Sequence, residues 1–274
     1  MFNLAIIDQQ AVKLLRASVV ITTLEQCLEE LIKNALDAKA TNIDIKVDIE
    51  KTMIQVCDNG VGIPSDHLLQ IAQTHVTSKC HTIKDLYETK TFGYRGEVLA
   101  ALANMSILQI TSKYQDSAET YTAIWKDGCL IEHSIIQGKQ KSGTIVTIPS
   151  LFCKYPVRRK YNNTSLDSLK YTTILFALIF PQVSFNLINS ARNMIILTTK
   201  KCSTSLEIFQ QLFGDRFSHA HSIHEKQFEI QGYFGNRVPT KVSAVLIPHK
   251  EKGSDLRFRD RNFSDYISII FRYQ

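Results

Sequence analysis

Long apolar runs and paired cysteines are both missing from this sequence. The longest apolar stretch, Ile174 to Phe180, is far shorter than the roughly 20 residues that cross a bilayer, so we expect no membrane span. Six cysteines are scattered without a Cys-x-x-Cys pair, and no signal-peptide pattern opens the chain. These absences predict a soluble intracellular protein with reduced thiols and exclude a disulfide-stapled secreted domain.

The composition also lacks any strong bias. Hydrophobic residues make up 44% of the 274 residues and charged residues 21%, which is typical of a globular protein and excludes disordered and collagen-like chains. The formal net charge of +6 permits an anionic partner such as DNA without demanding one. At roughly 150 residues per domain, the length predicts one large domain or two modest ones.

Apolar periodicity predicts a mixture of helices and strands. A helix at 24–38 should begin at the N-cap Thr23, with Gln26 as its capping-box partner. Further helices are predicted at 65–73, 97–103, 166–180 and 206–213, and strands at 43–49, 53–57, 106–112, 121–125, 130–134, 144–148, 183–187, 194–198 and 228–234. Because these elements alternate irregularly, with a hairpin signal at Asp127 and Gly128, we expect an α+β two-layer sandwich with helices on a mostly antiparallel sheet.

Three polar residues share one face of the first helix. Glu30, Asn34 and Asp37 follow one another at i, i+4 and i+7, which places them within about 60° of arc. A carboxamide oxygen beside carboxylates suits Mg²⁺, and a glutamate can polarise an attacking water. A merely solvated polar helix edge is the alternative interpretation.

A second motif, Asp58-Asn59-Gly60-Val61-Gly62, follows a predicted strand. An ionised aspartate only accepts hydrogen bonds, so it can bind the amino group of adenine but not the carbonyl that guanine has there. Glycines at Gly60 and Gly62 would let a ring approach the backbone closely. A plain Asp-Asn-Gly turn is the alternative.

A third set of residues suits phosphate binding. Gly93-Tyr94-Arg95-Gly96-Glu97 precedes a predicted helix, whose first N–H groups would favour an anion. Thr77-Ser78-Lys79 lies upstream, Gly143-Thr144 enters a strand, and Pro156-Val157-Arg158-Arg159-Lys160 forms a compact basic cluster. Taken singly, each of these also fits an ordinary turn or surface loop.

The order and spacing of these motifs are more specific than any one of them. Glu-x-x-x-Asn-x-x-Asp-Ala, then Asp-x-Gly-x-Gly, a glycine-rich loop and Gly-Thr together resemble the split nucleotide site of the ATPase superfamily of gyrase, Hsp90, histidine kinases and MutL. Thr-Ser-Lys, Gly-Tyr-Arg-Gly-Glu-Val-Leu and Pro-Val-Arg-Arg-Lys are similar to the MutL branch of DNA mismatch repair. The resemblance covers residues 1–235. The motif sequences are most similar to those of a eukaryotic MutL homologue of meiotic recombination.

The resemblance implies specific roles for the motif residues. Glu30 would be the general base for water, Asn34 the Mg²⁺ ligand, and Asp58 the residue that holds the adenine of ATP. The other residues that it assigns to the nucleotide are Asp37, Gly60, Gly62, Thr77, Ser78, Lys79, Gly93, Arg95, Gly96, Glu97, Val98 and Thr144.

The resemblance also implies an architecture and partners. A Bergerat-type ATPase domain at 1–200 would be followed, after a polar boundary at 199–205, by a partial or divergent domain at 201–274 similar to ribosomal protein S5. ATP binding would close two such domains, so another MutL homologue is the expected dimer partner. DNA held on a basic surface, a MutS-type mismatch recognition complex and a nuclear location are implied as well.

Two departures from the family pattern limit these expectations. After Phe234 the usual pattern of the second domain is not matched, so no lysine for the γ-phosphate is named. No endonuclease metal motif is found, because Asp8-Gln9-Gln10-Ala11 echoes one only faintly and in the wrong place. The histidines at 219, 221 and 224 lack cysteines or carboxylates at finger spacing, so a solvated loop is expected there rather than a metal site.

The motifs suggest three alternative functions. The first is a Mg²⁺-dependent ATPase of MutL type that acts as an ATP-gated clamp in mismatch repair. The second is a shortened module that binds ATP or a partner subunit but does not hydrolyse. The third is a chaperone or topoisomerase ATPase of the same superfamily, which the Gly-Tyr-Arg-Gly-Glu and Pro-Val-Arg-Arg-Lys motifs disfavour.

Overall fold

The computed structural model describes residues 19–72, 97–137, 141–160 and 164–214, together with the backbones of four strands at 219–225, 228–234, 247–249 and 270–273. Contacts between residues divide the chain into two compact units. The first comprises Met1–Thr172 and Phe185–Thr198, and the second comprises Thr173–Ser184 and Thr199–Gln274. All of the predicted site residues belong to the first unit.

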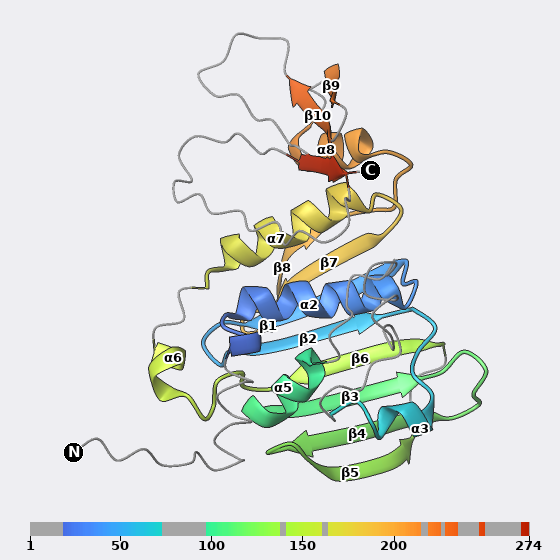
Figure 1. The fold of residues 1–274 in the computed structure, drawn as a ribbon, viewed down its shortest axis with the longest axis vertical. Coiled ribbons are helices and arrows are strands. Elements are labelled where there is room, and N and C mark those ends of the chain that lie inside the picture. The colour runs from blue at the N-terminus through green and yellow to red at the C-terminus, as the bar shows by residue number, and fades with distance from the viewer. Residues whose placement is uncertain are drawn as a thin grey trace. The chain divides into compact units, whose positions relative to one another are not determined.

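One eight-stranded sheet forms the framework of the first unit. Its strand order is β5-β4-β3-β6-β2-β1-β7-β8 (Figure 1). The strands are β1 (Asn42–Asp48), β2 (Met53–Asp58), β3 (Ile107–Lys113), β4 (Thr120–Lys126), β5 (Cys129–Ile136), β6 (Gly143–Ile148), β7 (Ser184–Asn189) and β8 (Met194–Thr198). Because the pairings β1–β2, β2–β6, β3–β6, β3–β4, β4–β5 and β7–β8 are antiparallel, the predicted mostly antiparallel sheet is confirmed.

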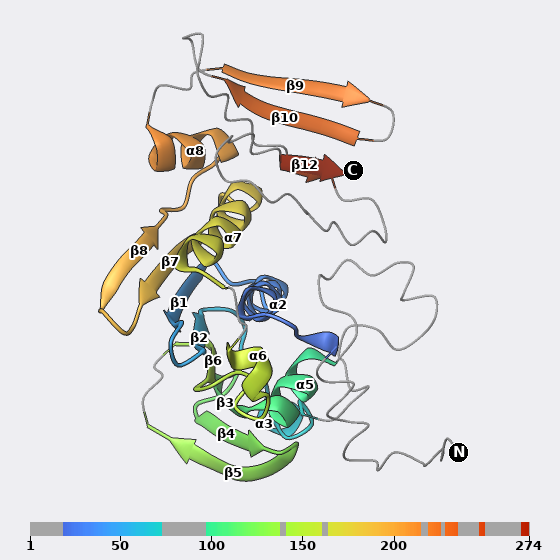
Figure 2. The same cartoon turned by 90° about the vertical axis from the view of Figure 1, so that its left-hand side faces the viewer.

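Helices cover one face of this sheet. The helix α2 (Leu24–Asp37) packs against β2, and α5 (Val98–Met105) packs against β3 and β4. Figure 2 shows both helices on the same side of the sheet. The structure also contains two short helices, α3 (Ser65–Leu68) and α6 (Pro156–Lys160), and the longer α7 (Leu166–Ile179).

The core forms where the apolar face of the sheet meets the apolar face of a helix. Every second residue of β1 is apolar, and Ile43, Ile45 and Val47 are fully buried. The apolar stripe of α2, which includes Leu24 and Leu28, is fully buried as well. Because a strand repeats every two residues and a helix about every 3.6, each element presents one continuous apolar face to the interior.

The first turn of α2 confirms the predicted N-cap and corrects its partner. The Gln26 backbone N–H donates to Thr23 Oγ1 at 3.0 Å, as expected of an N-cap threonine. The Gln26 side-chain oxygen, however, accepts from the backbone N–H of Thr22 at 2.9 Å rather than from Thr23. It also accepts from the Thr22 hydroxyl, so the Gln26 side chain contacts Thr22, the residue before the N-cap.

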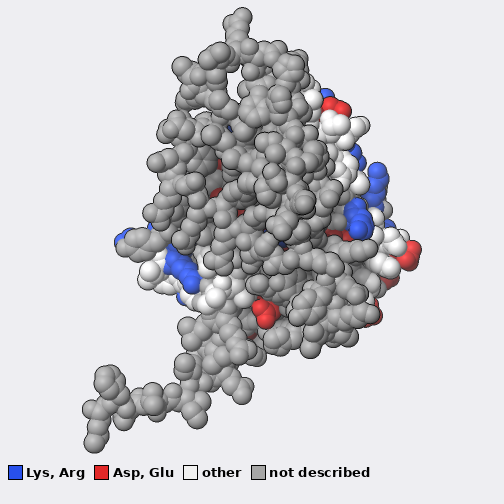
Figure 3. All heavy atoms as spheres, turned by 45° about the horizontal axis from the view of Figure 1, so that its top comes forward, with Lys and Arg blue, Asp and Glu red and all other residues white. Residues whose placement is uncertain are grey.

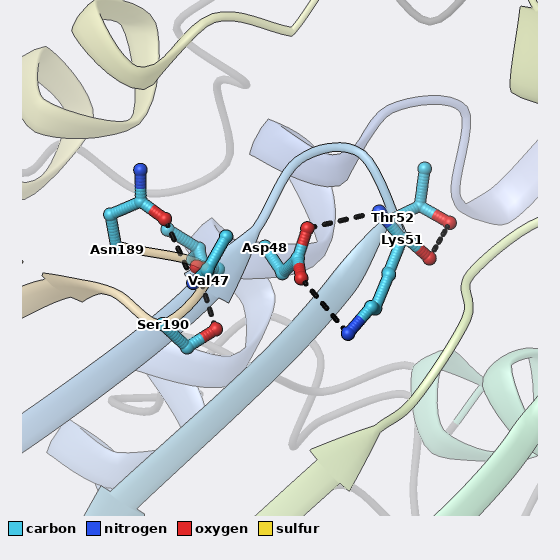
Figure 4. Close-up of polar contacts among 7 residues, drawn as sticks. Val47, Asp48, Lys51, Thr52, Asn189 and Ser190 are labelled. Carbon is cyan, nitrogen blue, oxygen red and sulfur yellow. Dashed lines mark hydrogen bonds and ion pairs between the residues drawn. The ribbon is translucent and has the colours of Figure 1, made fainter. Parts of the chain in front are cut away.

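Polar side chains stabilise the turn between β1 and β2. The register pairs Asp48 with Met53, which leaves four residues in the turn. Asp48 Oδ1 accepts from the Lys51 backbone N–H at 3.0 Å, and the Thr52 hydroxyl donates to the Lys51 carbonyl (Figure 4). Side-chain contacts of the buried Asp48 therefore close this turn.

Three local predictions differ from the structure. The helix predicted at 65–73 ends at Leu68, and the basic cluster at 156–160, read only as a charged segment, forms α6. The expectation of a solvated loop around the three histidines is wrong, because β9 (His219–Glu225) is a strand paired with β10 (Phe228–Phe234). The predicted turn at Asp127 and Gly128 is confirmed, and both residues adopt positive φ.

The second unit contains a helix and a small sheet. The helix α8 (Ser205–Phe213) is capped by Thr204, whose hydroxyl accepts from the Glu207 backbone N–H. Its four-stranded sheet has the order β11-β12-β10-β9, with β11 (Ile247–His249) and β12 (Ile270–Tyr273) beyond Phe234. Among the residues that the structure describes, no helix has the length and apolar character that crossing a bilayer requires.

Candidate functional site

Asp58, the last residue of β2, is a buried carboxylate with a fixed orientation. Only 7% of its surface is exposed. Its Oδ1 accepts from the backbone N–H of Gly60 at 2.8 Å and from that of Thr144 at 3.3 Å. The two N–H groups therefore fix the orientation of the Asp58 side chain at this strand end.

The glycines after Asp58 are required by close backbone contacts. A Cβ on Gly60 would lie 2.5 Å from the Ala38 carbonyl oxygen, and one on Gly62 would lie 2.0 Å from the Lys113 carbonyl oxygen. Gly62 also adopts a φ of +76°, which side chains rarely allow. Both predicted glycines therefore let the loop lie close to Ala38 and Lys113, where any side chain would clash.

The end of α2 and the Asp58 loop are hydrogen-bonded to each other. The Val61 backbone N–H donates to the Ala38 carbonyl at 2.9 Å. Asn59 Oδ1 accepts from the backbone N–H groups of Thr41 and Asn42, both at 2.8 Å. The structure thereby brings together the helix that carries Glu30 and the loop that follows Asp58, although 28 positions of sequence separate these two residues.

Ser112 is a buried residue of the site that the sequence motifs did not identify. Its hydroxyl oxygen accepts from the Ile63 backbone N–H at 2.8 Å and lies 3.0 Å from the Thr144 hydroxyl. The register of β3 and β6 pairs Ser112 with Thr144 directly. A serine at the end of a strand gives no sequence signal of its own, because its partners come from distant segments.

Glu30, Asn34 and Asp37 all lie on α2 and are partly buried. Glu30 Oε1 forms an ion pair with Lys33 Nζ at 2.8 Å, and neither residue of this pair is fully exposed. Burial raises the pKa of the Cys27 thiol, and the charge of Glu30 raises it further. The Glu30 carboxylate thus lies where the polar face of α2 meets its buried face.

Residues 21–139 match the family described as histidine kinase-, DNA gyrase B- and HSP90-like ATPase. The DNA mismatch repair protein Mlh3 of Homo sapiens is 33% identical over 229 residues, which cover 81% of this chain and 16% of that protein. The DNA mismatch repair protein MutL of Thermodesulfovibrio yellowstonii is 30% identical over 278 residues, covering 98% of this chain and 48% of that protein. The chain belongs to the MutL family.

The fold agrees with that of a solved MutL protein. The ATPase domain of Aquifex aeolicus MutL, complexed with ADP, superposes with a TM-score of 0.62 at 20% identity, over 81% of this chain and 80% of that one. The α+β fold predicted from the sequence is therefore confirmed as the MutL ATPase fold. The chain spans less than half the length of the two curated MutL-family relatives compared above.

Part of the predicted MutL nucleotide site lies outside the described residues. These positions are Thr77, Ser78, Lys79, Gly93, Arg95 and Gly96. The last two residues of the predicted phosphate loop are described: Glu97 is the N-cap of α5, and Val98 is its first residue. The Glu97 carbonyl accepts from the Ala101 backbone N–H at 2.7 Å, so the loop leads directly into a helix N-terminus.

No cluster of three or more histidine, cysteine or carboxylate side chains suited to a metal occurs within the described part of this MutL chain. The donors on α2 are of a different kind, a carboxamide at Asn34 with the carboxylates of Glu30 and Asp37. Such oxygen donors suit Mg²⁺, which usually keeps several waters and shares its remaining ligands with phosphates. The donor set therefore fits a metal that arrives with a nucleotide.

Proposed function

We propose that this chain binds ATP with Mg²⁺ and hydrolyses it, as the ATPase region of a MutL-type mismatch repair protein. The observation that carries the proposal is the buried Asp58 carboxylate, oriented by the backbone N–H groups of Gly60 and Thr144. A fixed carboxylate accepts a hydrogen bond from the adenine amino group and rejects a guanine carbonyl. Gly60 and Gly62 let the loop after Asp58 lie close to Ala38 and Lys113 beside the proposed pocket, and Thr144 would lie next to the adenine.

The α2 residues would act on the phosphate end. Asn34 would hold Mg²⁺, and Asp37 would support the nucleotide through the same face of the helix. Mg²⁺, when bound, would neutralise part of the phosphate charge. Glu30 would accept the proton of the water that attacks the γ-phosphorus. Support comes from the shared helix face and from the hydrogen bonds that join the end of α2 to the Asp58 loop.

The glycine-rich loop would close over the phosphates. In this proposal Gly93, Arg95 and Gly96 present backbone N–H groups to the phosphates, and Glu97 and Val98 continue the loop into α5. Thr77, Ser78 and Lys79 would join the same lid. The proposal is supported by the start of α5 at Val98, because the first N–H groups of a helix favour an anion.

The larger assembly is also part of the proposal. We place the ATPase domain at 1–200 and the start of an S5-like transducer domain at 201–274. Binding of ATP would favour pairing with another MutL homologue, and hydrolysis would release the pair. ATP would thus control how long the two domains stay paired. We also propose a MutS-type complex as a partner, a nuclear location and a role in meiotic recombination. The likeness to human Mlh3, a DNA mismatch repair protein, supports the role in repair.

DNA would be held by basic residues against phosphate. On the face shown in Figure 3, described basic and acidic side chains are interspersed. The densest basic cluster in the sequence is α6, where Arg159 and Lys160 are exposed. Such contacts are nearly independent of DNA sequence and weaken steeply with salt.

The decisive experiment measures ATP turnover and ATP binding by the purified chain with Mg²⁺. We expect turnover that Glu30→Ala lowers by about 10²-fold without loss of nucleotide binding. Asn34→Ala should abolish the Mg²⁺-dependent part of binding. Glu25→Ala, which removes another carboxylate from the same helix, serves as the control.

Two results would contradict the proposal in different ways. Turnover equal to that of Glu30→Ala, with ATP still bound, would make the chain a binding module without hydrolysis. Failure to bind ATP at all would remove the nucleotide site itself.

A further inference from the structure

Lys33 contacts the residue that the proposed function makes the general base. Its Nζ lies 2.8 Å from Glu30 Oε1, and the two side chains are 28% and 23% exposed. Lys33 also lies near Glu29, whose pKa it lowers against the raising effect of burial. The hydrogen bond, however, is made to Glu30. In the folded chain, Lys33 therefore pairs with Glu30 and not with Glu29.

The two neighbours of Glu30 lie on opposite sides of it. At about 100° per residue, Asn34 is displaced by about 40° from Glu30 around the helix, and Lys33 by about 60° in the other direction. An ion pair with Lys33 therefore draws the Glu30 carboxylate away from the side on which Asn34 lies. Asn34 is the residue proposed to meet the metal and the phosphates.

We infer that Lys33 is a positioning residue that restrains Glu30 and slows hydrolysis without affecting nucleotide binding. The inference rests on the proposed function, because it assigns a restraint to the proposed base. The Glu30 carboxylate has to leave the ammonium group, or share it, before it can orient a water at the γ-phosphorus. The strength of the ion pair thus adds to the barrier of the chemical step and not to the free energy of ATP binding.

A purely structural role for Lys33 makes the opposite prediction. A glutamate three residues before a lysine stabilises a helix slightly, so its loss should lower stability and, if anything, activity. A restraint, by contrast, predicts a gain of turnover when it is removed. A rise in turnover is therefore not what the structural role predicts.

The test compares Lys33→Met with the unaltered chain in steady-state turnover and in equilibrium binding of ATP with Mg²⁺. Methionine keeps an unbranched apolar side chain of similar length but removes the charge. We expect kcat to rise about threefold, in line with the modest strength of a partly exposed ion pair, with the dissociation constant unchanged within a factor of about two. Lys33→Arg keeps a cation, so its turnover should stay well below that of Lys33→Met.

Lys46→Met is the matched control, because Lys46 is an exposed lysine on β1. It removes the same charge from the same protein and should leave kcat unchanged. A rise confined to Lys33→Met would support the restraint, even if the unaltered chain turned over no faster than Glu30→Ala. Turnover in Lys33→Met equal to or below that of an active unaltered chain would overturn the inference while leaving the proposed ATPase intact. Absence of turnover in both would overturn the inference together with the proposed hydrolysis.

Discussion

The backbone N–H of Thr144 donates to Asp58 Oδ1 at 3.3 Å across 86 positions of sequence. The contact extends the ladder of β2 and β6, in which Cys57 pairs with Ile145. Strand register therefore delivers the donor to the carboxylate, and a shift by one residue would turn the Thr144 side chain to the other face of the sheet. The adenine acceptor proposed for this MutL chain depends on that pairing.

Replacing Asp58 by asparagine should weaken ATP binding while sparing the fold. The asparagine oxygen can still accept from Gly60 and Thr144, but the second carboxylate oxygen is replaced by an NH2 group, which cannot accept from the adenine amino group. We expect ATP affinity to fall about tenfold or more, measured by calorimetry, with little change in melting temperature. Asp116→Asn, at an exposed position, is the control. Unchanged affinity in Asp58→Asn would remove Asp58 from the nucleotide site.

Gly60→Ala should destabilise the chain through a steric clash. The added Cβ would lie 2.5 Å from the Ala38 carbonyl oxygen and 2.8 Å from the Ala38 Cβ, so the end of α2 would have to move. We expect the free energy of unfolding in urea to fall by roughly 1–3 kcal/mol. Gly214→Ala measures backbone strain without a clash, because its φ is +83° and its new Cβ would meet nothing within 4 Å. Full stability in Gly60→Ala would show that the loop is less closely packed than described.

Glu29 should make stability depend on pH. Burial raises the pKa of its carboxyl above the ordinary 4.5, with Lys33 opposing and Glu30 and Glu25 adding to the shift. Folding therefore favours the protonated form, so this contribution is fully present below the ordinary pKa and is lost as pH rises through the raised one.

Glu29→Gln keeps the neutral state at every pH. We expect the variant to melt above the unaltered chain at about pH 7, and the difference to vanish near about pH 4. Thermal melts followed by circular dichroism across this range provide the measurement. A variant that melts lower at neutral pH would mean that the charged carboxylate stabilises the fold instead.

The two arginines of α6 should behave differently. Arg159 is exposed, so Arg159→Ala should weaken plasmid binding and reduce the slope of log affinity against log salt by about one for each DNA phosphate that the arginine had neutralised. Arg158 instead donates from Nη1 to the Ile21 carbonyl at 3.3 Å and lies over the Tyr155 ring. Arg158→Ala should therefore lower the melting temperature.

Filter binding at rising salt measures the DNA effect, and Lys126→Ala, at an exposed residue of β4, is the control for removal of one positive charge. Equal salt slopes for Arg159→Ala and the unaltered chain would exclude α6 as a DNA-binding element.

Local sequence patterns predicted the elements that have long, regular periods. The alternation of β1 and the apolar stripe of α2 each repeat several times within one segment, and both elements lie where the patterns placed them. Short or polar elements escaped prediction. The five residues of α6 are too few to show a period, and the histidine-rich β9 lacks the alternating apolar residues that mark a strand.

The sequence by itself determined the motif order, the polar face of α2 and the glycines after Asp58, because these depend on residue type and on spacing within one segment. Only the tertiary structure decided that Thr144 and Gly60 orient Asp58, that Ser112 joins them, and that Lys33 bonds Glu30. Hydrogen bonds between distant strands depend on register, which does not exist until the sheet has formed. Sequence spacing alone allows Lys33 to pair with either Glu29 or Glu30.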